Sequence, residues 1–456
     1  MRAEDIINVN GNTVGKAEIL TGNINRIIMK IATPVAINNL FYSLYGLMDI
    51  IFVSQIGNIE LATIVFVQPI ESLFVAIGNG LAIASTSMIG KEIGRGGDGK
   101  TIIHQLLILA LLIGSTAALF VFFFTEEFLR IFSIDQSLLE LATLYFKILS
   151  VNILLLFFNH SYYGVKRARG ETVAVTVINT FSISVKLVSL YATIVIFDLG
   201  FSGVLFSTFI GNVIIALFAL YDLFFKNRII TVAGLFSIKF REMAELLRIA
   251  FPIIIEKSSM SFGQVIVNKY ALSYGVNVLT AFGVTNRINS VIFRFLTGFG
   301  TGTSILVSQN LGAKQTDRVK NIVVSGVKIS GILSTVLIGI LILFREPVAA
   351  IFSNGNADVL NHTIDAISIY SISAIPWAVM QIIIGYFQGT GQTQYNLLIS
   401  VARLYVFRIP IIVVLSQFGN IGAYSIWFGM LLSNIAVAVA SFYFQKRKQA
   451  QLFRTI

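Results

Sequence analysis

Three ionisable side chains lie in otherwise apolar segments, and they are the residues of this chain best suited to chemistry. Asp49, Glu71 and Lys186 each lie eight to eleven positions from the predicted outer end of an apolar segment. At about 1.5 Å per helical residue, they would lie at similar depths, roughly 12 to 16 Å inside a membrane boundary. Because a charge at membrane depth costs roughly 2.5 kcal/mol or more, each is a functional candidate.

The chemistry open to these groups is proton exchange. In a medium of low dielectric constant a carboxyl group favours its neutral form, whereas a neighbouring ammonium favours the ionised form. We therefore expect Asp49, Glu71 and Lys186 to form a shared proton-coupling pocket in the first half of the chain. The alternative is a permanent ion pair between Asp49 and Lys186 that only joins two helices.

The composition places these residues in an integral membrane protein. Over 456 residues the mean hydropathy is +0.83, 56% of residues are hydrophobic and 12% are charged, against roughly 25% charged in soluble proteins. The net charge of +11 gathers in short connections between apolar segments. This distribution favours a lipid bilayer as the partner of the basic residues and argues against nucleic acid. The chain has no cysteine, so disulfide bonds and thiol chemistry are excluded.

An internal repeat defines the organisation of the chain. Residues 31–34 (IATP) return as residues 249–252 (IAFP), and glycines at 57, 80 and 94 return at 275, 298 and 312, all displaced by 218 positions. A later block repeats with a similar shift, including Gly170 and Gly391. Two similar halves, each apolar throughout, are typical of secondary transporters built from two lobes.

Twelve stretches are long enough to cross the hydrocarbon core as helices, which takes about 20 residues each. We predict an all-α fold of twelve transmembrane helices in two pseudo-symmetric six-helix lobes. The predicted parts are a cytosolic tail (1–26), an N-lobe (27–226), a linker (227–242), a C-lobe (243–444) and a basic tail (445–456). Basic residues concentrate in alternate connections and both tails, which places both termini in the cytosol.

Two motifs resemble catalytic or cofactor sites, but their context argues against that interpretation. Residues 94–101 (GRGGDGKT) match the phosphate-binding pattern G-x-x-x-x-G-K-T. That pattern binds phosphate between a strand and a helix of an α/β domain, whereas here it joins two apolar spans. The three histidines lack the spacing of metal ligands. We therefore expect no enzymatic activity, no cofactor and no metal site.

The second half of the chain carries mostly cations at membrane depth. The candidate residues for a substrate cavity are Glu256, Lys257, Lys269, Arg287 and Arg294. Arg403 and Arg408 lie in the eleventh span. Some of these long side chains will extend to an interface, but their excess indicates a cavity less acidic than one made only for organic cations.

Pro34 is the candidate hinge. It lies fifteen residues before Asp49 in the same predicted span and interrupts the helical hydrogen bonds, which lets the span kink. Its repeat partner Pro252 has the same property, although a static kink is equally common.

Taken in order, several short motifs resemble those of the multidrug and toxic compound extrusion (MATE) family. They are Pro34, Asp49-x-x-x-Val53-x-x-x-Gly57, Arg167-x-x-Gly170-x-Thr172, Arg287, Gln309-Asn310-Leu311-Gly312-Ala313, Gly389-x-Gly391-x-Thr393 and Arg408-x-Pro410. Each is weak by itself, but their order on this repeat is fairly specific.

The resemblance implies export of amphipathic organic compounds, driven by inward flow of H+ or Na+. In one branch of the family an acid aligned with Asp49 couples the ion, and a proline aligned with Pro34 bends the helix when that acid is protonated. That branch adds an Asn and an Asp at positions occupied here by Lys186 and Leu190. The acid of the other branch would fall near Ser261 or Phe262 and is absent.

From these features we predict a proton-coupled antiporter of small organic substrates that acts as a monomer in the cell (plasma or inner) membrane. Because a fixed cation at Lys186 would repel Na+, H+ is the favoured coupling ion and Na+ the alternative. A second possibility is a flippase or exporter of lipid-linked or anionic precursors, which the buried cations favour. A third is a channel-like membrane protein.

Overall fold

The computed structural model describes residues 15–453, except for 132–133, 135, 232–233, 235–236, 354 and 419–420. Part of the predicted cytosolic tail (residues 1–14) and the last basic residue, Arg454, therefore lie outside the described residues. So do Asn354 in a predicted turn, the repeated Gly419, and the side chains of Ser261 and Phe262.

The regular elements among the described residues are all helical. In the first half they are α2 (Lys16–Thr21), α3 (Ile24–Ile56), α4 (Asn58–Arg95), α5 (Lys100–Phe123), α6 (Thr125–Ile131), α7 (Gln136–Ala168), α8 (Thr172–Tyr191), η2 (Ala192–Ile196), α9 (Gly200–Leu220) and η3 (Tyr221–Lys226). In the second half they are α11 (Phe240–Ser273), α12 (Val276–Gly312), α13 (Thr316–Leu343), α14 (Arg345–Ser353), α15 (Ala357–Tyr370), η4 (Ser371–Ser373), α16 (Ala374–Thr390), α17 (Gln394–Val401), η5 (Ala402–Arg408), α18 (Ile409–Ser416) and α19 (Tyr424–Phe453).

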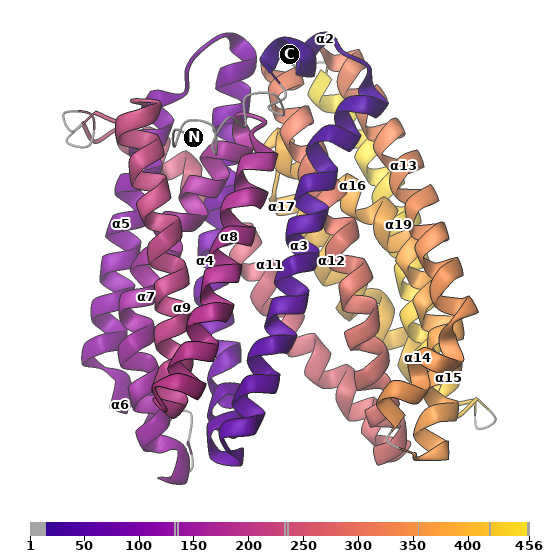
Figure 1. Ribbon diagram of the computed structural model, residues 1–456. Coiled ribbons are helices and arrows are strands. Elements are labelled where there is room, and N and C mark those ends of the chain that lie inside the picture. The colour runs from indigo at the N-terminus through magenta and orange to yellow at the C-terminus, as the bar shows by residue number, and fades with distance from the viewer. Residues whose placement is uncertain are drawn as a thin grey trace, which may run out of the picture. The chain divides into compact units, whose positions relative to one another are not determined.

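The helices have the lengths that a membrane requires. Ten described helical stretches are long and apolar enough to cross it. Two further helices, α3 and α11, are 33 and 34 residues long. These twelve stretches, six in each half of the chain, confirm the predicted all-α membrane fold (Figure 1).

The chain folds into two compact units that are interleaved in sequence. Unit 1 contains Phe41–Ile254 and the segment that ends at Lys16, whereas unit 2 contains Ala17–Leu40 and Ile255–Ile456. The sequence-based prediction placed each lobe in one continuous stretch. In the structure, the part of α3 up to Leu40 belongs to unit 2 and the part of α11 up to Ile254 belongs to unit 1, and the predicted lobe boundaries stay a prediction.

Unit 1 is built around α7, which packs against α4, α5 and α9. Its core includes Phe146 and Phe157, both fully buried. Small residues allow the close approach of α4 and α7: a Cβ added to Gly164 would lie 2.8 Å from the carbonyl oxygen of Ala82. A continuous apolar core of this kind gives α8 and α9 a rigid surface to pack on.

Unit 2 is built around the crossing of α12 and α16. Here the two backbones touch, because a Cβ added to Gly385 would lie 2.1 Å from the backbone oxygen of Gly300. The first part of α3 packs on the same helix: a Cβ at Gly298 would lie 2.5 Å from the backbone of Ala36. Small residues at such crossings are typical of membrane helices, whose association depends on close packing.

The sequence repeat corresponds to repeated structure. Gly170, between α7 and α8, has a φ of +79°, and its repeat partner Gly391, between α16 and α17, has a φ of +74°. This left-handed conformation favours glycine because a Cβ would be strained there. The same turn therefore ends the fourth long helical stretch in each half.

A proline lies in each of the two helices whose residues are divided between the units. Pro34 lies inside α3, six residues before the unit boundary that follows Leu40. Pro252 lies inside α11, two residues before the boundary that follows Ile254. Since proline removes one backbone hydrogen bond, each of these helices is weakened close to the point where it changes unit.

Candidate functional site

The structure brings two of the predicted coupling residues together in unit 1. Lys186, on α8, places its Nζ 3.0 Å from Oδ2 of Asp49, on the second part of α3. The Lys186 side chain is 9% exposed and that of Asp49 is 26% exposed. They form a largely buried ion pair that ties α3 to α8.

The two members of the ion pair have different surroundings. The ammonium of Lys186 lies 3.9 Å from the ring centroid of Tyr45, a cation–π contact that stabilises the positive charge. The second carboxylate oxygen of Asp49, Oδ1, is buried and has no hydrogen-bond partner among the described residues. Asp49 therefore has one carboxylate oxygen paired with Lys186 and one without a hydrogen-bond partner among the described residues.

Glu71 belongs to the same site, although it makes a different contact. The hydroxyl of Tyr145, on α7, donates a 2.7 Å hydrogen bond to Oε2 of Glu71, on α4. The carboxylates of Glu71 and Asp49 are close enough to repel each other electrostatically. All three predicted coupling residues therefore lie in one region of unit 1, contributed by α3, α4 and α8.

An apolar cluster lies one helical turn beyond the ion pair on both α3 and α8. Val53, Leu190 and Val204 are buried together, with contributions from α3, α8 and α9. Leu190 lies one helical turn after Lys186 and is fully buried. One branch of the family that the sequence resembles carries a second acid at the position of Leu190. Here that acid is replaced by a hydrophobic residue that packs in the core.

A second polar group in unit 1 was not predicted from the sequence. Asn179, on α8, accepts hydrogen bonds from the hydroxyl groups of Tyr163 (2.7 Å) and Tyr42 (3.3 Å). It lies about two turns before Lys186 on the same helix. The apolar stretches of this chain contain several other asparagines and tyrosines, so nothing in the sequence distinguishes these three.

Unit 2 contains a different polar cluster. Oε1 of Glu256, on α11, accepts a 3.0 Å hydrogen bond from Ser400 and lies 3.7 Å from Nζ of Lys257. Arg403, on η5, is 3% exposed and stacks on Trp377 with its guanidinium carbon 4.5 Å from the ring centroid. Its Nε has no hydrogen-bond partner among the described residues.

Arg408, at the end of η5, adds a second buried cation. It is 5% exposed and donates hydrogen bonds to Ser433 (3.2 Å) and Asn434 (2.9 Å). Arg403 interacts electrostatically with both Arg408 and Glu256. Three cations, Arg403, Arg408 and Lys257, are thus associated with the single carboxylate of Glu256, which gives this cluster an excess of positive charge.

The structure separates the predicted cavity residues into two groups. Glu256 is buried and belongs to the cluster just described. The other four, Lys257, Lys269, Arg287 and Arg294, have exposed side chains. Their role in a substrate cavity stays a prediction.

The glycine-rich segment at residues 94–101 connects two helices. It runs from the end of α4 to the start of α5, and no strand precedes it among the described residues. The Lys100 backbone N–H donates a hydrogen bond to Asp98, and this bond lowers the pKa of the exposed Asp98 carboxyl group. The segment is thus a helix–helix turn with its own local hydrogen bonding.

The described residues contain no group of three or more potential metal-ligating side chains. One of the three histidines, His104, is buried and accepts a 3.2 Å hydrogen bond from the backbone N–H of Thr231. The groups at the site in unit 1 are the ionisable side chains of Asp49, Glu71 and Lys186 and the hydroxyl of Tyr145.

Comparison with known proteins gives this arrangement a context. The MatE family model matches residues 34–192 and 252–414, which covers both halves of the repeat. The chain is 22% identical to a Bacillus subtilis protein named probable multidrug resistance protein YoeA, over 87% of this chain and 88% of the relative. It is also 22% identical to an FAD transporter of Shewanella oneidensis, over 94% of this chain and 96% of the relative.

Solved structures show the same fold. A MOP superfamily transporter from Pyrococcus furiosus, described as having a binding pocket of reverse polarity, superposes with a TM-score of 0.90 at 22% identity. The match covers 96% of this chain and 99% of that chain. The fold is therefore shared over nearly the whole length of both chains.

Proposed function

The chain belongs to the MatE family, and from this premise we propose that it is an antiporter that exports amphipathic organic compounds in exchange for H+. The helix lengths support its location in a membrane, and the name of the Bacillus subtilis relative supports drug-like substrates. We propose the cell membrane as its location, with both termini in the cytosol, and a monomer as the working unit.

The observation that carries the proposal is the buried ion pair between Asp49 and Lys186. A proton on Oδ1 of Asp49 would remove the charge that holds Lys186, and the contact between α3 and α8 would weaken. The free energy of the two conformations of the protein would then depend on protonation. This dependence is what a coupling site must provide, because an ion drives a conformational change only through a difference in affinity.

Pro34 gives the released helix a place to bend. Asp49 lies on the part of α3 that packs in unit 1, whereas Pro34 lies on the part that packs in unit 2. Loss of the ion pair frees the part that carries Asp49, and the missing hydrogen bond at Pro34 lowers the cost of bending there. We therefore propose that proton binding at Asp49 changes the angle between the two parts of α3.

Protons suit this site better than Na+. A bound Na+ needs several oxygen ligands close to the carboxylate, yet the ammonium of Lys186 lies 3.0 Å from Oδ2 of Asp49 and repels a second cation. The nearby Leu190 supplies no ligand. A proton requires only Oδ1, which has no hydrogen-bond partner within the part of the chain that the structure describes. Na+ is the alternative ion, and a sodium gradient provides its test.

Transport into or out of proteoliposomes tests the proposal directly. An imposed pH gradient should drive movement of a fluorescent organic cation in the wild type, and Asp49→Asn should abolish this coupling. The matched control is Asp98→Asn, which neutralises an exposed acid in the α4–α5 turn and should leave transport unchanged. Glu71→Gln should reduce coupling, because it removes the charge that accepts the Tyr145 hydrogen bond.

Two results decide between coupling and a structural ion pair. If Asp49→Asn retains full transport driven by the pH gradient, the pair serves only to join helices and the coupling role is wrong. If a sodium gradient drives transport in the wild type at constant pH, Na+ is the coupling ion instead.

A second candidate is export of organic anions or lipid-linked precursors. Arg403 and Arg408 are buried in unit 2, and Arg403 interacts electrostatically with Arg408 and with one carboxylate, that of Glu256. An anionic substrate would compensate their positive charge, and the relative in Shewanella oneidensis is named an FAD transporter. Including FAD and other anions in the same transport assay separates the candidates. Arg403→Met should then impair anion transport and leave cation transport intact.

A further inference from the structure

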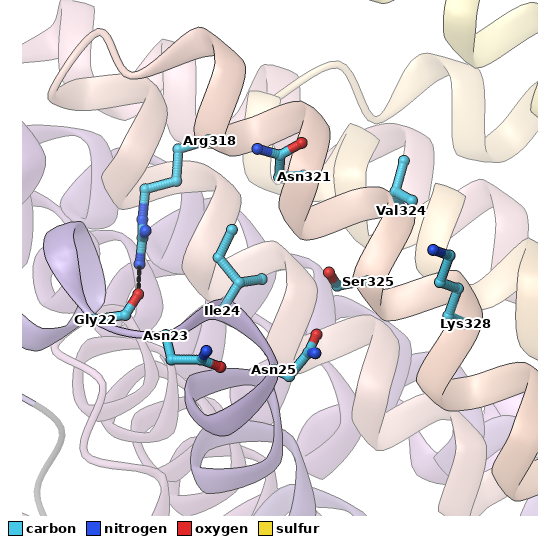
Figure 2. Close-up of a pocket in the computed structure, with 9 residues that line it drawn as sticks. All are labelled: Gly22, Asn23, Ile24, Asn25, Arg318, Asn321, Val324, Ser325 and Lys328. Carbon is cyan, nitrogen blue, oxygen red and sulfur yellow. Dashed lines mark hydrogen bonds between the residues drawn. The ribbon is translucent and has the colours of Figure 1, made fainter.

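Unit 2 carries a polar groove whose role the proposed transport mechanism does not explain. It has a volume of about 460 Å³ and lies between the turn that connects α2 to α3 and one side of α13 (Figure 2). The turn and the first two residues of α3 contribute residues 22–25, and α13 contributes Arg318, Asn321, Val324, Ser325 and Lys328. Its size falls in the range of small-ligand sites, about 300 to 1,000 Å³.

The polar side chains of α13 form one continuous stripe. Arg318, Asn321, Ser325 and Lys328 are spaced by three, four and three residues, which places them on one face of the helix. The same helix is strongly apolar over its membrane-spanning window. A polar stripe along the first three turns of such a helix needs polar partners.

The groove carries a positive charge that no ion pair among the described residues neutralises. Arg318 and Lys328 line it, and none of its lining residues is an acid. The nearest acids in sequence are already engaged in ion pairs outside the groove: Glu18 with Lys30, and Asp317 with Lys320. Lys328 makes no ion pair with any residue that the structure describes. An anionic ligand would therefore meet two cations with no competing carboxylate.

Arg318 organises one wall of the groove. Its Nε and Nη2 donate to the carbonyl oxygen of Ile19, at 3.3 and 3.1 Å, and Nη2 also donates to the carbonyl oxygen of Gly22 (Figure 2). These bonds hold the α2–α3 turn against α13. Asn23 on the turn, Asn25 at the start of α3 and Asn321 on α13 are exposed and add amide groups.

The position of the groove along α13 matches the headgroup region of a bilayer. Arg318 lies in the first turn of α13, and Lys328 lies ten residues further, about 15 Å along the axis. Helical side chains tilt toward the N-terminal end, so the Lys328 ammonium extends back toward Arg318. The headgroup layer lies just outside a hydrocarbon core about 30 Å thick.

An exposed apolar row continues from the groove along the same side of α13. Its members follow Lys328 at intervals of three or four residues and are at least half exposed: Ile332, Val336, Ile340 and Leu343. A ligand with a charged head and an apolar chain would satisfy both the groove and this row. A free phosphate ion would satisfy only the groove.

We propose that this groove binds the phosphate group of an anionic phospholipid, held by Arg318, Lys328 and the neighbouring amides, with an acyl chain along the exposed row of α13. Basic pockets at the ends of membrane helices are suited to anionic headgroups. Bound lipid would join the α2–α3 turn to α13 and so stabilise the start of α3 within unit 2.

Native mass spectrometry of the full chain tests this proposal. The purified protein is titrated with phosphatidylglycerol or phosphatidylcholine, and retained lipid is counted. The wild type should retain phosphatidylglycerol in preference to phosphatidylcholine. Lys328→Gln should weaken retention about fivefold, because one basic residue near anionic lipid contributes about that factor. The matched control, Lys320→Gln, neutralises a lysine on α13 outside the groove and should change retention less than twofold.

A second variant separates the lipid site from general basicity. Asn321→Asp places a negative charge between Arg318 and Lys328 and should weaken retention at least as much as Lys328→Gln. Equal retention by the wild type and both groove variants would overturn the proposal, as would an equal loss in Lys320→Gln. Displacement of phosphatidylglycerol by an equal concentration of inorganic phosphate would overturn the assignment to lipid, because it would show that the groove binds a free anion as well as it binds the headgroup.

Discussion

The ion pair between Asp49 and Lys186 should contribute measurable stability, and the contribution should depend on pH. The perturbation is a double-mutant cycle with Asp49→Asn, Lys186→Met and the combined variant. Asp49→Asn leaves a cation that is 9% exposed beside Tyr45 with no counter-ion. Lys186→Met leaves the Asp49 carboxylate without its ion-pair partner. The combined variant removes both charges and should recover much of the stability lost in each single variant.

The geometry sets the size of the effect. Two unit charges 3.0 Å apart attract by roughly 5.5 kcal/mol at an effective dielectric constant of about 20. The Asp49 side chain is 26% exposed, so water screens part of this attraction. We therefore expect a coupling free energy of about 2 to 3 kcal/mol, somewhat below the cost of breaking a fully buried pair, about 3 to 5 kcal/mol.

The assay is equilibrium unfolding in mixed micelles with increasing denaturing detergent, repeated at several pH values. The pair requires an ionised Asp49, so its stabilisation should be present at about pH 8 and decline as the pH falls and the carboxyl group takes up a proton. The matched control is the same cycle on Asp317 and Lys320, whose side chains are 87% and 51% exposed. It should give a coupling below about 0.5 kcal/mol.

Two results would refute this reasoning. A coupling free energy for Asp49 and Lys186 no larger than that of the exposed control pair would show that the contact adds no stability. A large coupling that stays constant from about pH 8 to pH 5 would show that Asp49 does not exchange its proton in that range. The ion pair would then be a permanent link between α3 and α8.

Two further predictions concern the scaffold. Lys166 is 4% exposed and lies between the carboxylates of Glu171 and Asp222. Lys166→Met should therefore destabilise the protein by about 3 kcal/mol, measured as a lower Tm. A loss of stability no larger than that caused by Arg169→Met, at a more exposed position, would contradict this prediction. Gly385→Ala would place a Cβ 2.1 Å from the backbone oxygen of Gly300 and should cost at least about 2 kcal/mol. Gly331→Ala, which meets no atom within 4 Å, should leave the Tm unchanged, and equal Tm values for the two alanine variants would disprove the close crossing.

The sequence was sufficient for the membrane class, the helical fold and the repeat. These properties depend only on the order and length of segments in the chain. The length of an apolar stretch decides whether it spans a bilayer, and a constant shift between motifs indicates duplication. It also drew attention to Asp49, Glu71 and Lys186, because a charge in an apolar stretch is visible without any knowledge of contacts.

The partners of those charges were decided by tertiary structure. Tyr45 and Tyr145 become parts of the site only because α3 packs near α8 and α4 packs on α7. Tyrosine is common on membrane helices, and no local pattern distinguishes a tyrosine that meets a buried charge. The sequence predicts Glu256 and four cations as residues of one substrate cavity. In the structure, Glu256 is the one buried residue of these five, and it lies near Arg403.

The division of the chain into units also depends on tertiary packing. The sequence predicts continuous lobes because it shows two copies of one pattern in order. Which neighbours the first part of α3 packs against is a matter of surface complementarity, here between Ala36 on α3 and Gly298 on α12, 262 positions apart in the chain. Periodicity and composition describe each helix by itself, whereas such contacts depend on pairs of helices that only folding brings together.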